Sequence, residues 1–151
     1  MDARIQTLES LPLTMRIVRL PGIHHDANAV LLIGFEEAIL IDSGTAWYQL
    51  LQQERIIGQC GDACKLREIV LTSRRYPFSG GSLSISQHFD NIPISAHHSA
   101  ISSLSTGDFF TTWANRFDSD MPRFDVQGIE ENMLKILNND SIEILEAPGP
   151  S

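Results

Sequence analysis

The segment Leu71–Gly81, LTSRRYPFSGG, decides which fold this sequence is expected to adopt. It follows REIV (67–70), whose residue types are those of a strand, and it closes on two glycines. Those glycines open GGSLSISQHF (80–89), which predicts a short helix. The side chains of the loop between strand and helix therefore bear most directly on whether the chain is an enzyme.

Outside this segment, the pattern predicts strands and helices in alternation, with a hairpin near each end. Alternating polar and apolar residues predict the first strand, and apolar runs joined by short polar turns predict the hairpins. The order indicates a mixed sheet covered by helices. The expected elements are a strand at 14–20, a hairpin at 29–42, a helix at 46–58, strands at 66–72 and 92–97, a short helix at 80–89, helical turns at 98–104, a long loop with some helix at 106–125 and a hairpin at 133–147.

The helix at 46–58 is predicted from the spacing of its apolar residues, with Thr45 as a plausible N-cap. The apolar residues with this spacing are Trp47, Leu50, Leu51 and Ile57.

The composition excludes several classes of protein. The chain has 151 residues, which is enough for one domain, and a formal net charge of −8, which would repel a nucleic acid. Its longest apolar runs have the length of strands, far below the roughly 20 residues that span a bilayer, so no membrane segment is expected. The N-terminus lacks the basic start and apolar stretch of a secretion signal, so the expected location is cytoplasmic.

Several segments, taken in order, resemble the metallo-β-lactamase superfamily: NAVLLIGFEEAILIDSG (28–44), a helix, IVLT…GG within 69–81, IPISAH (92–97) and EILEAPGPS (143–151). The resemblance implies a mixed α+β fold, an αββα sandwich of two mixed sheets with helices outside. It implies one such domain over residues 1–151, incomplete at its C-terminus. In that family the early hairpin ends in a pattern like Leu-Ile-Asp-Ser/Thr-Gly. The signature loop reads Thr-His-x-His-x-Asp-His-x-Gly-Gly.

The resemblance can be carried onto this chain position by position. Asp42 and Gly44 match the end of the hairpin, and Thr72, Gly80 and Gly81 match the threonine and closing glycines of the loop. Other residue types occupy the positions of the five metal-binding side chains. These are Ser73, Arg75, Pro77, Phe78 and, after the matching Pro148 and Gly149, Pro150.

The resemblance implies zinc, iron or manganese ions that are held by imidazoles and carboxylates and activate a water molecule. The residues present argue against such an ion. Serine is a poor ligand unless it is ionised, and proline and phenylalanine have no side-chain donor atom. The permanent charge of Arg75 would repel a divalent cation. We therefore expect no cofactor and no catalytic residue at this loop.

Arg75 or Arg74 offers a replacement for the missing ion. Because the aspartate that matches Asp42 lies under the metal loop in the family, either guanidinium could pair with it. The alternative is that both arginines point into solvent. The space left between Asp42, Ser73, Arg75 and Phe78 could bind an anionic small molecule.

Displaced ligands would be the way to keep a zinc or iron ion. One histidine of the His24–His25 pair could reach a metal, whereas the alternative is that the five histidines, which also include His88, His97 and His98, are scattered on the surface. Cys60 and Cys64 are spaced as C-x3-C without a second pair, which is a weak metal signal and is also typical of ordinary thiols.

The leading interpretation is a metallo-β-lactamase-like domain with a degenerate metal site and a structural, regulatory or ligand-binding role. The alternative is a metal-dependent hydrolase of an ester, thioester or phosphodiester, which uses displaced ligands or a partner chain. The sequence stops three residues after Pro148, where the resemblance implies further strands and helices. Either the chain is a piece of a longer product, or the protein lacks this segment and part of its sheet faces water or a partner. In the second case we expect a homodimer or a complex with a partner protein.

Overall fold

The computed structural model describes residues 15–61, 64–130, 134–137 and 140–145. The elements, in chain order, are β1 (Arg16–Leu20), β2 (Ala29–Ile33), β3 (Glu37–Ile41), η2 (Ala46–Tyr48), α2 (Gln49–Cys60), β4 (Lys65–Val70), α3 (Tyr76–Ser79), α4 (Ser82–His88), β5 (Ile94–His97), η3 (His98–Ala100), α5 (Ile101–Thr106), η4 (Ala114–Phe117), β6 (Gln127–Ile129), β7 (Leu134–Leu137) and β8 (Asp140–Glu143). Both predicted hairpins and the alternation of strands and helices between them are confirmed.

Six strands form one mixed sheet in the order β1-β2-β3-β4-β5-β6. The first three strands are antiparallel, whereas β3, β4, β5 and β6 run parallel to one another. Parallel neighbours need a crossover between them, and the helical segments supply it. The carboxyl ends of these four strands consequently meet along one edge of the sheet.

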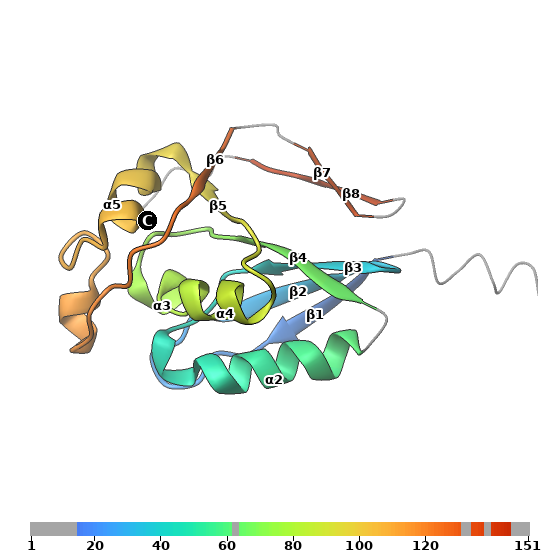
Figure 1. The fold of residues 1–151 in the computed structure, drawn as a ribbon, viewed down its shortest axis with the longest axis horizontal. Helices are drawn as coiled ribbons and strands as arrows, with labels where there is room; N and C mark the ends of the chain where they lie inside the picture. Colours follow the sequence, from blue (N-terminus) through green and yellow to red (C-terminus); the bar gives the residue numbers. More distant parts are fainter. Residues whose placement is uncertain (1–14, 62–63, 131–133, 138–139, 146–151) are drawn as a thin grey trace, which may run out of the picture.

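The sheet lies between a helical layer and the β7–β8 hairpin. Figure 1 shows α2, α3 and α4 beneath the sheet and the hairpin across its opposite face. The larger core lies between the sheet and the helices and includes Leu40, Ile56, Ile69 and Ile85. A smaller cluster on the other face joins Ile39 and Val70 to Leu137 in the hairpin, so both faces of the sheet carry apolar contacts.

The predicted helix at 46–58 is confirmed as η2 and α2, but its apolar residues do not form its buried face. Leu50 is 70% exposed, and Trp47, Leu51 and Ile57 are also exposed. The residues that α2 buries are Gln52, Gln53 and Ile56. The Gln52 amide donates to the Ser43 carbonyl at 3.3 Å and the Gln53 amide to the Ser84 hydroxyl at 3.2 Å. Buried polar groups need such partners, and these bonds turn the amide face of α2 inward.

Strand β6 is an element that the sequence pattern misses. It spans only Gln127–Ile129 and contains a glycine, so neither its length nor its composition indicates a strand. It forms because β5 offers a parallel partner, with His97 opposite Ile129. The long loop that precedes it contains the short helix η4, as expected.

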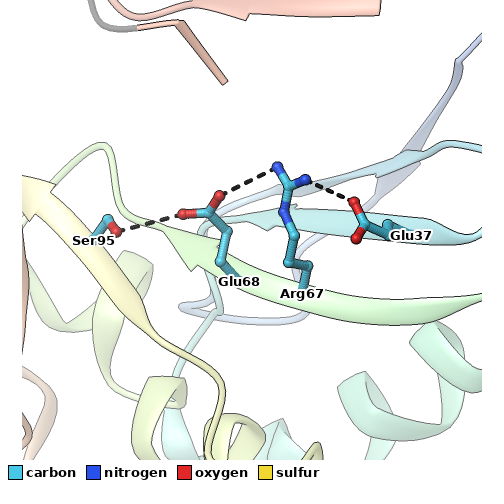
Figure 2. Close-up of polar contacts among 4 residues, drawn as sticks. All are labelled: Glu37, Arg67, Glu68 and Ser95. Carbon is cyan, nitrogen blue, oxygen red and sulfur yellow. Dashed lines mark hydrogen bonds and ion pairs between the residues drawn. The ribbon is translucent and has the colours of Figure 1, made fainter. Parts of the chain in front are cut away.

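A charged network lies on the hairpin side of the sheet. Figure 2 shows the Arg67 guanidinium between the carboxylates of Glu37 and Glu68, at 2.7 and 3.5 Å. Glu68 is only 5% exposed, and its carboxylate also accepts a long hydrogen bond of 3.5 Å from the Ser95 hydroxyl. Arg67 therefore supplies the counter-charge that a buried carboxylate needs.

Candidate functional site

The loop that follows β4 lies at the carboxyl edge of the sheet, where ligands bind in open sheets of this type. Its backbone is tied to three other segments of the chain. The backbone bonds are Ser43 N to Phe78 O at 2.8 Å, Gly81 N to Gly44 O at 2.8 Å, Ala27 N to Pro77 O at 3.0 Å and Tyr76 N to Thr112 O at 2.7 Å. Pro77 and Phe78, two of the expected ligand positions, thus contribute carbonyl oxygens that hold the loop in place.

The closing glycines of the loop are explained by close packing. A Cβ atom on Gly81 would lie 2.8 Å from the Thr45 carbonyl oxygen, and one on Gly80 would lie 2.4 Å from the Tyr76 ring. The Tyr76 side chain is almost fully buried. Side chains at these two positions would therefore push the loop away from the sheet.

Asp42 directly follows β3 and lies beneath this loop. Its carboxylate accepts hydrogen bonds from the Thr72 backbone N–H at 2.8 Å and from the Thr72 hydroxyl at 2.6 Å. Asp42 is 5% exposed and has a left-handed backbone conformation with φ 64°. Burial raises the pKa of its carboxyl to about 6, although the Thr72 donors act in the opposite direction.

The pairing of Asp42 with an arginine is not found among the described residues. The Arg75 guanidinium instead lies over the Trp113 ring, 3.4 Å from its centroid. Arg74 donates from Nε to the Thr111 carbonyl at 3.2 Å. Thr72 holds Asp42 where an arginine was expected, and both arginines turn toward the segment 108–117. For Arg75, the alternative expectation of a side chain that points into solvent is not met, since its Nε is buried.

Trp113 and Arg116 are site residues that the sequence interpretation missed. The Arg116 guanidinium lies 4.1 Å from the Trp113 ring centroid, so two cations contact one indole. Trp113 has φ 63°, an unusual backbone conformation for a bulky residue. The available signal is the run TTWANRF (111–117), which contains two aromatic residues and one arginine. This run has no periodicity that links it to the loop after β4.

The remaining expected positions lie near this edge without forming a ligand set. The Ser73 hydroxyl accepts a hydrogen bond from the Arg75 backbone N–H at 3.1 Å, which is a local turn contact. Pro150, like Pro148 and Gly149, lies outside the described residues. No group of three or more His, Cys, Asp or Glu side chains in the described part of the chain is placed to hold a metal ion.

The histidines have separate surroundings. His24 hydrogen-bonds through Nδ1 to the Tyr48 hydroxyl, and His25 lies edge-on to Phe117 with ring centroids 5.3 Å apart. His97 ends β5, and its ring lies 4.0 Å from that of His98. These histidines therefore form two separate sequence pairs, His24–His25 before β2 and His97–His98 at the end of β5.

The two cysteines are free thiols, Cys60 at the end of α2 and Cys64 just before β4. Burial, together with the neighbouring Cys64 thiol, raises the pKa of the Cys60 thiol to about 12. Burial also raises the pKa of Cys64. Because a metal binds the thiolate, this environment opposes metal binding at neutral pH.

Solved structures with the same arrangement of elements are subclass B3 metallo-β-lactamases. BJP-1 of Bradyrhizobium japonicum matches with a TM-score of 0.72 and 17% identity, over 91% of this chain and 51% of that one. The chain has the metallo-β-lactamase fold. MIM-1 of Novosphingobium pentaromativorans matches with a TM-score of 0.68 and 20% identity, over 82% of this chain and 46% of that one. This metallo-β-lactamase-fold chain thus spans about half the length of the structures it matches.

Sequence comparison alone does not reach these enzymes. No known protein-family profile and no curated protein sequence matches the chain. A third solved structure, SMB-1 bound to 2-mercaptoethanesulfonate, has a TM-score of 0.71 and 20% identity, over 91% of this chain and 52% of that one.

The metal ions of the metallo-β-lactamase fold do not fit the residues that stand at the loop here. Arg75 carries a positive charge, and Pro77 and Phe78 have no side-chain donor atoms. The two carboxylate oxygens of buried Asp42, beneath the loop, are already bound by Thr72. No reaction step through a metal ion can be derived from the described residues.

In the described part of the chain, no helix is both long and apolar enough to cross a bilayer.

Proposed function

We propose that this protein is a non-catalytic member of the metallo-β-lactamase fold that binds a ligand instead of hydrolysing one. The observation that supports the proposal is the Arg75 guanidinium on the Trp113 ring. The sequence resemblance assigns the position of Arg75 to a metal ligand. A permanent cation at this place disfavours a divalent ion and favours an anion. The loop after β4, which the resemblance assigns to metal ligands, would here serve as a binding surface.

The scaffold of the loop supports this role. Thr72 donates two hydrogen bonds to the buried Asp42 carboxylate, which therefore has partners without a metal. The backbone hydrogen bonds of Pro77 and Phe78 hold the loop on the sheet. A protein that keeps this arrangement keeps a rigid carboxyl edge. A loop that is held in place but lacks metal ligands suits ligand binding better than metal-dependent hydrolysis.

The test is the metal content of the protein after purification without chelators or a metal-affinity tag. We expect less than about 0.1 zinc, iron or manganese ion per chain after incubation with each metal and dialysis. We expect no hydrolysis of ester, thioester or phosphodiester probes. A subclass B3 metallo-β-lactamase treated in parallel is the positive control. A stoichiometric ion together with metal-dependent hydrolysis would support the alternative function, a hydrolase with displaced ligands.

A further inference from the structure

The Trp113 ring contacts two guanidinium groups that come from different segments. Arg75 precedes α3 and lies 3.4 Å from the indole centroid, while Arg116 belongs to η4 and lies 4.1 Å from it. The two guanidinium carbons can be no farther apart than the sum of these distances. Two like charges at such a separation repel each other unless a negative charge joins them.

Neither guanidinium has a carboxylate partner among the described residues. Moreover, the Arg75 Nε atom is buried and lacks a hydrogen-bond acceptor. A buried donor without a partner costs about 1–3 kcal/mol. Because the chain has 19 acidic against 11 basic residues, two arginines without an acidic partner are unexpected at this place.

The acidic groups near this edge are bound elsewhere. The Asp108 carboxylate accepts hydrogen bonds from the backbone N–H groups of Phe110 and Thr111, at 2.9 Å each. Asp42 is bound by Thr72. Asp108 also attracts Arg74 through space, but neither carboxylate forms an ion pair with Arg75 or Arg116. An external anion would supply the negative charge that neither of these carboxylates gives to Arg75 and Arg116.

We propose that Arg75, Arg116 and Trp113 form a binding site for the phosphate group of a small molecule. The inference rests on the proposed function, because a metal at this loop would compete for the same anion. Each guanidinium can donate two parallel hydrogen bonds to a phosphate, and two of them match a doubly charged oxyanion. A monocarboxylate offers one charge and two oxygens, so it binds more weakly.

The neighbouring aromatic residues indicate the rest of the ligand. Phe110 is 70% exposed and lies edge-on to Phe109, with ring centroids 5.2 Å apart. The Trp113 backbone N–H donates to the Phe110 carbonyl at 3.0 Å, so all three aromatic residues belong to one turn. An aromatic group attached to the phosphate would contact this turn, and aryl phosphates should bind more tightly than inorganic phosphate.

The experiment uses the fluorescence of Trp113. The chain has two tryptophans, so Trp47→Phe leaves Trp113 as the single reporter. Because the guanidinium groups of Arg75 and Arg116 both contact the Trp113 ring, an anion that binds them should change the indole emission. The titrants are inorganic phosphate, phenyl phosphate and acetate at constant ionic strength. Saturable changes with the order phenyl phosphate, phosphate, acetate are expected, with acetate at least about tenfold weaker than phosphate.

Two charge-matched variants test the assignment. Arg116 is exposed and makes no side-chain hydrogen bond in the described structure, so Arg116→Gln should fold and weaken phosphate binding about tenfold or more. Arg19, exposed on the edge strand β1, is the control, and Arg19→Gln should leave binding within about twofold. Arg75→Gln should abolish binding, with circular dichroism as the check of folding.

Three outcomes would overturn the site. They are no saturable signal up to about 10 mM phenyl phosphate, equal binding of acetate and phosphate, or equal losses in the Arg116 and Arg19 variants. Metal content is measured on the same samples. A metal-free protein without phosphate binding would refute this site alone, whereas a stoichiometric metal ion would refute the proposed function itself.

Discussion

Thr72 donates both its backbone N–H and its hydroxyl to the carboxylate of Asp42, at 2.8 and 2.6 Å. This pair joins the end of β3 to the end of β4 beneath the candidate site. Burial nevertheless raises the pKa of Asp42 to about 6 from its ordinary value of 3.8. The loss of solvent around the carboxylate thus outweighs the two donors.

The raised pKa of Asp42 predicts a specific pH dependence of stability. Between about pH 4 and pH 6 the folded protein keeps a proton that the unfolded chain has lost. The contribution of Asp42 to the free energy of unfolding should therefore fall as the pH rises through this interval, by about 3 kcal/mol in total. Above pH 6 it should be constant.

Asp42→Asn isolates this contribution, because asparagine does not titrate and also tolerates the left-handed backbone at this position. Urea unfolding of both proteins at pH 4, 5, 6 and 7 gives the difference in unfolding free energy, wild type minus variant. That difference should decrease from pH 4 to pH 6. A difference that is constant or that increases with pH would contradict the buried protonation of Asp42.

Gly44 and Gly58 should respond oppositely to alanine. A Cβ on Gly44 would lie 2.6 Å from Asp26 Oδ2, and Gly44 has φ +78°. The same Asp26 carboxylate accepts hydrogen bonds from the Thr45 backbone N–H, at 3.0 Å, and from the Thr45 hydroxyl. Gly44→Ala should thus cost about 2 kcal/mol or more, because it adds backbone strain and displaces Asp26.

Gly58 lies within α2, and a Cβ there would meet no atom within 4 Å. Gly58→Ala should stabilise the protein by about 0.5–1 kcal/mol, since alanine has the higher helix propensity. Thermal unfolding followed by circular dichroism measures both variants. Equal shifts of Tm in the same direction would show that the packing around Gly44 is not as described.

The network of Figure 2 predicts that Arg67 matters more than its exposed partner. Arg67→Ala removes the counter-charge of buried Glu68 and should cost about 1–3 kcal/mol. Glu37→Gln removes only the exposed pair with Arg67 and should cost less than about 1 kcal/mol. Chemical denaturation gives both values. A loss for Glu37→Gln as large as that for Arg67→Ala would refute the assigned role of Glu68.

The homodimer or partner complex expected from the sequence stays a prediction. Exposed apolar side chains such as Leu50 (70%) and Ile17 (69%) are compatible with association. Light scattering should give a mass above the 16.8 kDa of one chain at micromolar concentration. A monodisperse monomer that also fails to bind an apolar dye would contradict this expectation.

Local patterns predicted most of the fold because they depend on neighbours in the sequence. The apolar runs of β2 and β3, joined by a short polar turn, pair as expected, with Val30 opposite Ile41. The Thr45 side chain caps the helical segment by accepting from the Trp47 backbone N–H. The sequence pattern misses β6, where a distant partner, β5, decides the structure.

The sequence by itself determined that ligand-binding residue types are absent from Ser73, Arg75, Pro77 and Phe78, since residue identity needs no structure. Only the tertiary structure decided what Arg75 does instead. Its partner Trp113 belongs to a distant segment without periodicity, and packing of that segment on the loop after β4 brings the two together. Such contacts depend on three-dimensional packing, which a local pattern of residues does not encode.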